Sequence, residues 1–109
     1  MTLTRALASL ALTMALPRTA LAGDWQYCLA PSHAEHKVYM SAPFPAGGAL
    51  ATADHLFDRR LEQAGLRHDD VQCPRANGER AALVMRQHAI AFNQKLGNTI
   101  IPLRFEAEW

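Results

Sequence analysis

The segment Lys37–Phe44 has the sequence KVYMSAPF, and its alternating pattern is typical of a β-strand. One face of this strand would carry the apolar side chains Val38, Met40, Ala42 and Phe44. The opposite face would carry Lys37, Tyr39 and Ser41. Because proline donates no backbone hydrogen bond, Pro43 should end this strand or confine it to a sheet edge.

A second strand is predicted just before this segment. Trp25–Ala30, with the sequence WQYCLA, alternates in the same way. The residues between the two strands, 31–36, are mostly polar or turn-forming. This arrangement predicts a β-hairpin.

Two amphipathic helices are predicted downstream. In Thr52–Gly65 the apolar side chains recur every three or four residues, and the helix should stop at Gly65. The second helix should extend from an N-cap at Asn77 to about Leu96. Its predicted inner stripe includes Met85, Phe92 and Leu96.

Two further strands complete the pattern. Val71–Pro74 reads as a very short strand between the helices, and Thr99–Trp109 alternates cleanly after the second helix. The predicted order is β-β-α-β-α-β, an α+β fold. We expect a four-stranded, mostly antiparallel or mixed sheet with both helices on one face. The other face would be more polar, and Tyr39 with Arg104 could form a binding surface there.

The first 22 residues have the parts of a secretory signal peptide. Arg5 supplies the positive charge of the n-region, and Ala6–Leu16 is an apolar run of 11 residues that suits the h-region. Small residues then predict cleavage between Ala22 and Gly23. The alternatives are a buried helix and an uncleaved membrane anchor, but spanning a bilayer needs about 20 apolar residues. We therefore predict a signal peptide at residues 1–22 and one domain at residues 23–109, with no stable anchor after cleavage.

Both cysteines, Cys28 and Cys73, lie in the region that follows the signal. In an exported chain an even number of cysteines favours pairing, which predicts a disulfide between them. The alternatives are a metal site, a redox pair and two free thiols. The predicted location is periplasmic or secreted.

The charge balance excludes some partners. The whole chain has 11 Lys and Arg against 10 Asp and Glu. Removal of residues 1–22 takes away Arg5 and Arg18, which leaves nine against ten and a net charge of about −1. Such a near-neutral domain gives no electrostatic reason to expect nucleic acid or an anionic membrane as a partner.

The histidines near the predicted hairpin are the candidate metal ligands. His33 and His36 offer two imidazoles within four residues, beside Glu35. Imidazole binds divalent transition metals well, but no third ligand has diagnostic spacing, so a solvated loop is the alternative. Ser32 and Ser41 lie outside any nucleophile motif, and Gly47-Gly48 lacks the phosphate-loop pattern. No catalytic residue and no cofactor is predicted.

Four short pieces of the sequence form a recognisable pattern after the signal peptide. They are Tyr27-Cys28, Val38–Ser41, Phe57 and Val71–Pro74. In these features the chain resembles a loose group of small, uncharacterised exported bacterial proteins. The resemblance implies a bacterial periplasmic or secreted location and supports the disulfide. It implies no activity.

Three functions are compatible with this sequence. The leading hypothesis is an exported, non-enzymatic module that binds a protein or peptide, for example by strand addition at an edge near Pro102. The second is a metal-binding accessory protein that uses His33 and His36. The third is a small hydrolase or an enzyme inhibitor, for which no residue gives positive support.

Overall fold

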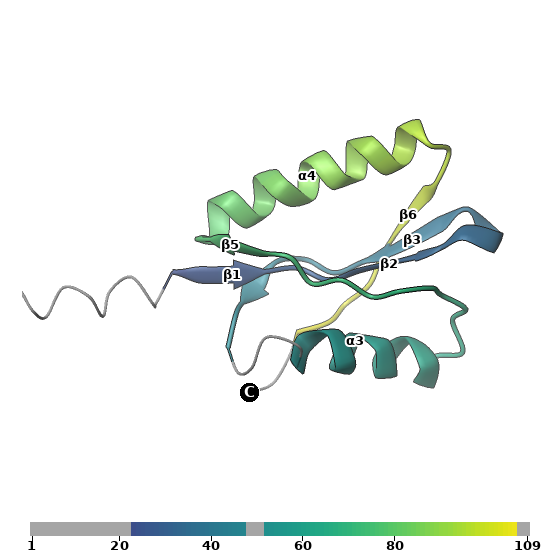
Figure 1. Cartoon of the computed structure of the whole chain (residues 1–109), viewed down its shortest axis with the longest axis horizontal. Coiled ribbons are helices and arrows are strands. Elements are labelled where there is room, and N and C mark those ends of the chain that lie inside the picture. The colour runs from purple at the N-terminus through teal and green to yellow at the C-terminus, as the bar shows by residue number, and fades with distance from the viewer. Residues whose placement is uncertain (1–22, 48–51, 107–109) are drawn as a thin grey trace, which may run out of the picture.

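The computed structural model describes residues 23–47 and 52–106, and Figure 1 shows their arrangement. The elements in chain order are β1 (Asp24–Gln26), β2 (Leu29–Ser32), the 3-10 helix η1 (His33–Glu35), β3 (Lys37–Met40), β4 (Phe44–Pro45), α3 (Thr52–Gln63), β5 (Arg75–Asn77), α4 (Glu79–Lys95) and β6 (Thr99–Pro102). The α+β class is therefore as predicted. The predicted signal peptide and the cleavage after Ala22 lie outside the described residues.

The strands form two three-stranded sheets, so the prediction of one four-stranded sheet is wrong. One sheet has the order β4-β1-β5, and both of its strand pairs are antiparallel. The other has the order β2-β3-β6, in which β2 and β3 form the predicted hairpin and β6 pairs with β3 in parallel. Each of the two strands predicted in the hairpin is divided between the two sheets.

A β-bulge accounts for this division. Leu29 pairs with Met40, and Gln26 pairs with Phe44. Between these pairs, the three residues Ser41–Pro43 face only the two residues Tyr27 and Cys28. The Ser41 hydroxyl accepts a hydrogen bond from the Cys28 amide at 2.9 Å, where a regular ladder would use a backbone carbonyl. The regular pairing is interrupted at this point.

The two helices cover opposite faces of the strand layer, with α4 above it and α3 below it in Figure 1. Cys28, Ala30 and Tyr39 pack in a buried cluster with α3, whereas Val38 and Met40 belong to a second cluster beside α4. The prediction of both helices on one face is therefore wrong. The strands alternate between two apolar faces, and each face needs a cover. Tyr39 is only 3% exposed, so the predicted surface of Tyr39 and Arg104 does not exist.

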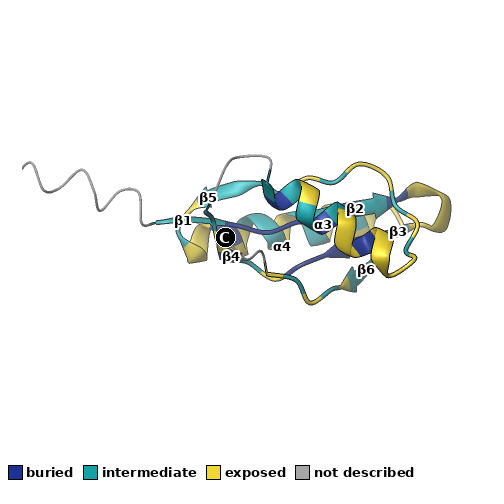
Figure 2. Cartoon of the chain, turned by 90° about the horizontal axis from the view of Figure 1, so that it is seen from below, coloured by how far each residue is buried: buried dark blue, intermediate teal, exposed yellow. Residues whose placement is uncertain are grey.

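More of the buried residues belong to the cluster on the α3 side than to the cluster beside α4, and Figure 2 marks the buried parts of the chain in dark blue. Ala53, Phe57 and Leu61 are the buried residues of α3, which lies within the segment predicted as helical. Phe105 packs on edge against Phe57 and Phe44, with ring centroids 5.0 and 5.7 Å apart. These contacts hold the chain after β6 against α3.

Helix α4 presents a different stripe from the predicted one. Its buried residue is Ala82, and Met85, Ala89 and Ile90 pack partly against the strands. Phe92 and Leu96 are 62% and 60% exposed, so their predicted inner position is wrong. Apolar residues surround this helix on nearly every side, and such a pattern does not specify which side faces the strands. The N-cap is Gly78 rather than the predicted Asn77.

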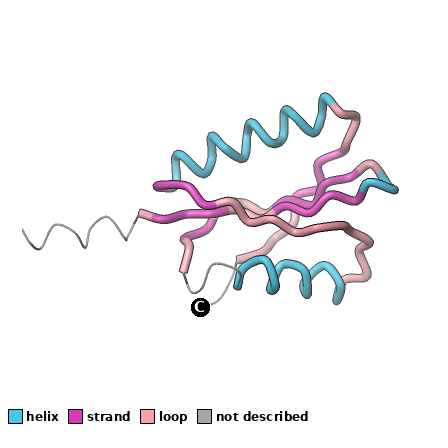
Figure 3. The backbone as a smooth tube through the Cα atoms, viewed as in Figure 1, coloured by secondary structure: helices cyan, strands magenta, loops and turns pink. Residues whose placement is uncertain are grey.

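The predicted disulfide joins Cys28 to Cys73 and is confirmed. It links β1 and β2 to the segment that leads into β5. This segment, a loop in Figure 3, lies beside the first strands. Leu29 and Gln72 exchange backbone hydrogen bonds, and the Tyr27 amide donates to the Pro74 carbonyl. The strand predicted at Val71–Pro74 is thus reduced to one bridge, and the regular strand begins at Arg75.

Candidate functional site

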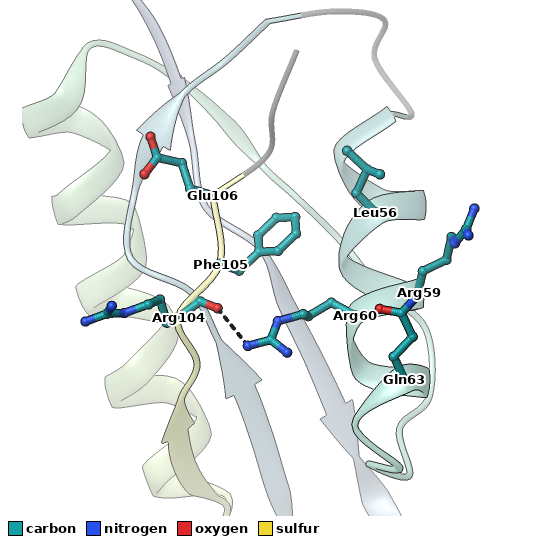
Figure 4. A pocket seen from close by; sticks show the side chains of 7 residues that line it. All are labelled: Leu56, Arg59, Arg60, Gln63, Arg104, Phe105 and Glu106. Atoms are coloured by element: carbon teal, nitrogen blue, oxygen red, sulfur yellow. Dashed lines mark hydrogen bonds between the residues drawn. The ribbon is translucent and has the colours of Figure 1, made fainter.

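A groove of about 570 Å³ lies between α3 and the chain that follows β6 (Figure 4). Its lining comes from one side of α3 and from three consecutive residues after β6. The lining residues are Leu56, Arg59, Arg60, Gln63, Arg104, Phe105 and Glu106. The groove therefore combines three guanidinium groups, one amide and one carboxylate with two apolar side chains.

Local structure explains how these residues meet. On α3, the spacing of Leu56, Arg59, Arg60 and Gln63 places them along one side of the helix. After β6, Phe105 is anchored in the α3 core, and its ring points toward α3 in Figure 4. In an extended chain the neighbours of an inward residue turn outward. Arg104 and Glu106 are accordingly exposed at the rim.

Arg60 is the guanidinium that reaches across the groove. Its Nη2 donates a long hydrogen bond of 3.5 Å to the Arg104 carbonyl. The side chains of Arg59 and Arg104 lead away from the groove on opposite sides (Figure 4). All three arginines are exposed, so they can turn toward a ligand at little cost in desolvation.

A second hollow, of about 360 Å³, lies on the other side of the same chain segment. It shares Arg104, Phe105 and Glu106 with the groove and adds Arg86 from α4. The Arg86 Nε donates a 2.7 Å hydrogen bond to the Ser41 carbonyl, which fixes this guanidinium next to the bulge. Basic side chains thus flank residues 104–106 on both sides.

The chemistry of the groove suits the binding of an anion. Guanidinium groups donate paired hydrogen bonds to carboxylates and phosphates. Of the described residues that line the groove, none is a Ser, Cys or His that could act as a nucleophile or as a base near neutral pH. The arrangement can hold an anion beside an apolar group.

The other side of α3 is acidic. A hollow of about 260 Å³ is lined there by Asp54, His55, Asp58, Asp69, Asp70 and Val71. Next to it, His68 lies 2.6 Å from Asp58 through Nε2 and 2.9 Å from the Leu66 carbonyl through Nδ1. Burial alone lowers the pKa of His68, but these two hydrogen bonds and the charges of Asp58 and Glu62 outweigh it, and the pKa is raised. Both ring nitrogens are occupied, so His68 cannot serve as a general base.

The candidate metal ligands lie at the far end of the hairpin. The His33 ring is 76% exposed, with its Nε2 3.8 Å from a carboxylate oxygen of Asp69. The His33 amide donates to the same oxygen at 2.9 Å. His36 ends η1 in a left-handed conformation, with φ 56°. Among the described residues, no group of three His, Cys, Asp or Glu could hold a metal ion. Metal binding by His33 and His36 stays a prediction.

The edge near Pro102 is a poor place for strand addition. The backbone amides of Thr99 and Leu103 donate hydrogen bonds to carbonyls at the two ends of β3. The backbone groups of the residues between them therefore point alternately toward β3 and away from it. The outward positions are then Ile100, Pro102 and Arg104. Pro102 has no amide hydrogen, and the Arg104 carbonyl accepts from Arg60. Of these three outward residues, Ile100 is the one that offers both a backbone amide and a backbone carbonyl to an added strand.

The groove could not be found from the sequence. In the sequence, Arg59 looks like a solvated residue on the outer face of the predicted helix, and Arg60 simply follows the spacing of its apolar stripe. The available signal is the spacing of Leu56, Arg59, Arg60 and Gln63, but their partners at 104–106 lie more than 40 residues away in the chain. Tertiary contacts bring the two segments together, among them the packing of Phe105 against Phe57 and the hydrogen bond from Arg60 to the Arg104 carbonyl.

No protein-family model, curated protein or solved structure matches this chain. The resemblance to small exported bacterial proteins therefore stays a prediction. Within residues 23–47 and 52–106, no helix is long and apolar enough to cross a membrane.

Proposed function

We propose that this protein is an exported, non-enzymatic module that binds an acidic segment of a protein or peptide in the groove beside α3. The observation that supports this proposal is the set of three arginines, Arg59, Arg60 and Arg104, around the apolar side chains of Leu56 and Phe105. Glu106 is the one acidic residue in that lining.

The size and chemistry of the groove fit a short peptide segment. Its volume falls within the range of about 300–1,000 Å³ that is usual for ligand sites. Carboxylates would accept from the guanidinium groups, and an apolar side chain would cover Leu56 and Phe105. Arg60 already donates to a carbonyl oxygen in this place, which a stronger anionic acceptor can replace.

Export is supported by the Cys28–Cys73 disulfide, because such bonds persist mainly in oxidising compartments. The pattern of residues 1–22 is the second support. Intact mass of the protein secreted by expressing cells, before and after reduction, tests both points. A product that retains residues 1–22, or one with two free thiols, would contradict export.

Binding can be tested with two labelled peptides of opposite charge. A fluorescein-labelled DEFDE peptide should bind, whereas KKFKK should not, and the affinity should fall with added salt. Arg60→Gln combined with Arg104→Gln should weaken binding of the acidic peptide roughly 10-fold or more, because hydrogen bonds to charged groups contribute about 1.5–3 kcal/mol. Fluorescence anisotropy provides the measurement.

The matched control is Arg80→Gln, which removes an arginine of α4 that lies outside the groove. This variant should bind the acidic peptide as the unchanged protein does. Equal binding of both peptides, or equal losses in the groove variant and the control, would show that the groove is not the binding site.

A further inference from the structure

The segment from Val71 to Asn77 is an open edge of the strand layer. Gln72 and Pro74 turn their backbone groups toward β1 and β2, where they form hydrogen bonds. In an antiparallel ladder the alternate residues face away, and these are Val71, Cys73, Arg75 and Asn77. The backbone groups of Val71 and Cys73 have no partner among the described residues. This edge therefore presents free donors and acceptors at regular spacing.

Two side chains next to this edge also lack partners. Gln26 is 0% exposed, and neither atom of its amide has a hydrogen-bond partner. The Nε and Nη2 atoms of Arg75 are likewise buried without a partner. Both residues lie in one cross-strand row, because Gln26 pairs with Phe44 on one side and with Arg75 on the other. Buried donors without partners are rare and costly in folded proteins.

The arrangement of this row indicates which kind of strand and side chain would complete it. Phe44 belongs to the α3 core, so the row Phe44, Gln26, Arg75 lies on that face and ends at the open edge. Within residues 23–47 and 52–106, no strand fills the next position in the row. A residue there would have its Cβ about 4.5–5.5 Å from that of Arg75. Nε and Nη2 form the side of a guanidinium that receives a carboxylate with two hydrogen bonds.

We propose that an extended peptide with an acidic side chain adds as a strand along Val71–Asn77, with its carboxylate bound to Nε and Nη2 of Arg75. The backbone of the peptide would use the free groups of Val71 and Cys73, which give affinity without sequence preference. Arg75 selects the acidic residue. Because Arg75 lies on the edge strand and is only partly buried, its guanidinium can turn toward the added strand while the backbone stays in place. This site is separate from the groove.

Nuclear magnetic resonance titration of the oxidised, exported protein tests this proposal. The probes are the peptides acetyl-STVETVS-amide and acetyl-STVQTVS-amide, which differ only in the central residue. The backbone amide signals of Val71, Cys73 and Asn77 should shift, and the Glu peptide should bind about 10-fold more tightly than the Gln peptide. A third peptide, acetyl-STPEPVS-amide, cannot form the ladder and should not bind.

The informative variant is Arg75→Gln, with Arg67→Gln as the matched control in an exposed loop. Arg75→Gln should abolish the preference for the Glu peptide and leave the melting temperature unchanged or higher, since it removes a buried charge without a partner. Arg67→Gln should change neither property. A residue with a purely structural role would instead lower the melting temperature.

Three results would overturn the proposal. One is equal affinity of the unchanged protein for the Glu and Gln peptides. Another is a similar loss of stability in Arg75→Gln and Glu108→Gln, which would show that a carboxylate of this chain already serves Arg75. The third is a peptide-free dimer in ultracentrifugation that blocks the peptide, which would make a second copy the occupant of the edge.

Discussion

Helices α3 and α4 cover opposite faces of the same strands, but they contribute very differently to the core. The 12-residue α3 buries Ala53, Phe57 and Leu61 completely or nearly so. The 17-residue α4 buries Ala82 and leaves Phe92 and Leu96 largely in solvent. Helix length is therefore a poor guide to the free energy that a helix contributes.

The α4 face is held in part by polar contacts. Arg86 donates to the Ser41 carbonyl and also lies near Tyr27, a residue that is buried beneath α4. Burial raises the pKa of Tyr27, and the positive charge of Arg86 partly opposes this effect. The α3 face, by contrast, holds the aromatic contacts of Phe105 and the disulfide. We expect stability to depend mainly on the α3 face.

The largest difference should appear when one phenylalanine is removed from each helix. Phe57→Ala should destabilise the protein by about 3–5 kcal/mol, because it leaves a cavity in the core. Phe92→Ala should change stability by no more than about 0.5 kcal/mol, because its side chain is already largely exposed to solvent. Urea denaturation measures both. Similar losses in the two variants would refute the asymmetry between the helices.

Removal of the disulfide should have the second largest effect on stability. It closes a loop with a sequence separation of 45 residues, and removal of such a bond costs about 2–5 kcal/mol. We expect Cys28→Ala combined with Cys73→Ala to lower the midpoint of urea unfolding accordingly. A midpoint equal to that of the oxidised protein would show that packing against α3 is sufficient alone.

The smallest effect concerns His68, which connects the loop after α3 to that helix. Its pKa is raised above the ordinary 6.5 in the folded protein. The stabilisation that the protonated ring gives is therefore fully present below about pH 6.5, and it is lost as the pH rises through the higher pKa of the folded state. Asp58→Asn should therefore cost on the order of 1 kcal/mol in mild acid and less at alkaline pH. Urea denaturation across this pH range measures the cost, and a pH-independent cost would contradict it.

The sequence was informative where structure is local. Helix α3 lies within the segment predicted as helical, and a hairpin forms as predicted, although Pro31 and Ser32 of the predicted loop belong to its first strand. The cysteine pair could be predicted because two cysteines allow one connectivity. These features depend on short-range periodicity or on residue counting.

Long-range features could not be predicted in the same way. Pro43 indicates a strand end, but the extra residue at Ser41–Pro43 becomes visible only when both partners are known. The alternation predicts one apolar face covered by both helices and a second, more polar face, but Cys28 and Tyr27 are buried in separate clusters on the two faces. The groove depends on Arg104 reaching the side of α3. Each of these results from tertiary contacts rather than from local sequence.

The position of Cys73 gives the disulfide a second consequence. This residue lies within the open edge from Val71 to Asn77, at a place where regular strand structure has not yet begun. With reduced thiols, a few backbone hydrogen bonds and the packing of Val71 and Cys73 against the α3 core would keep that stretch beside β2. Oxidation of the two thiols would therefore hold the backbone of this edge at a fixed distance from the strands that contain Cys28.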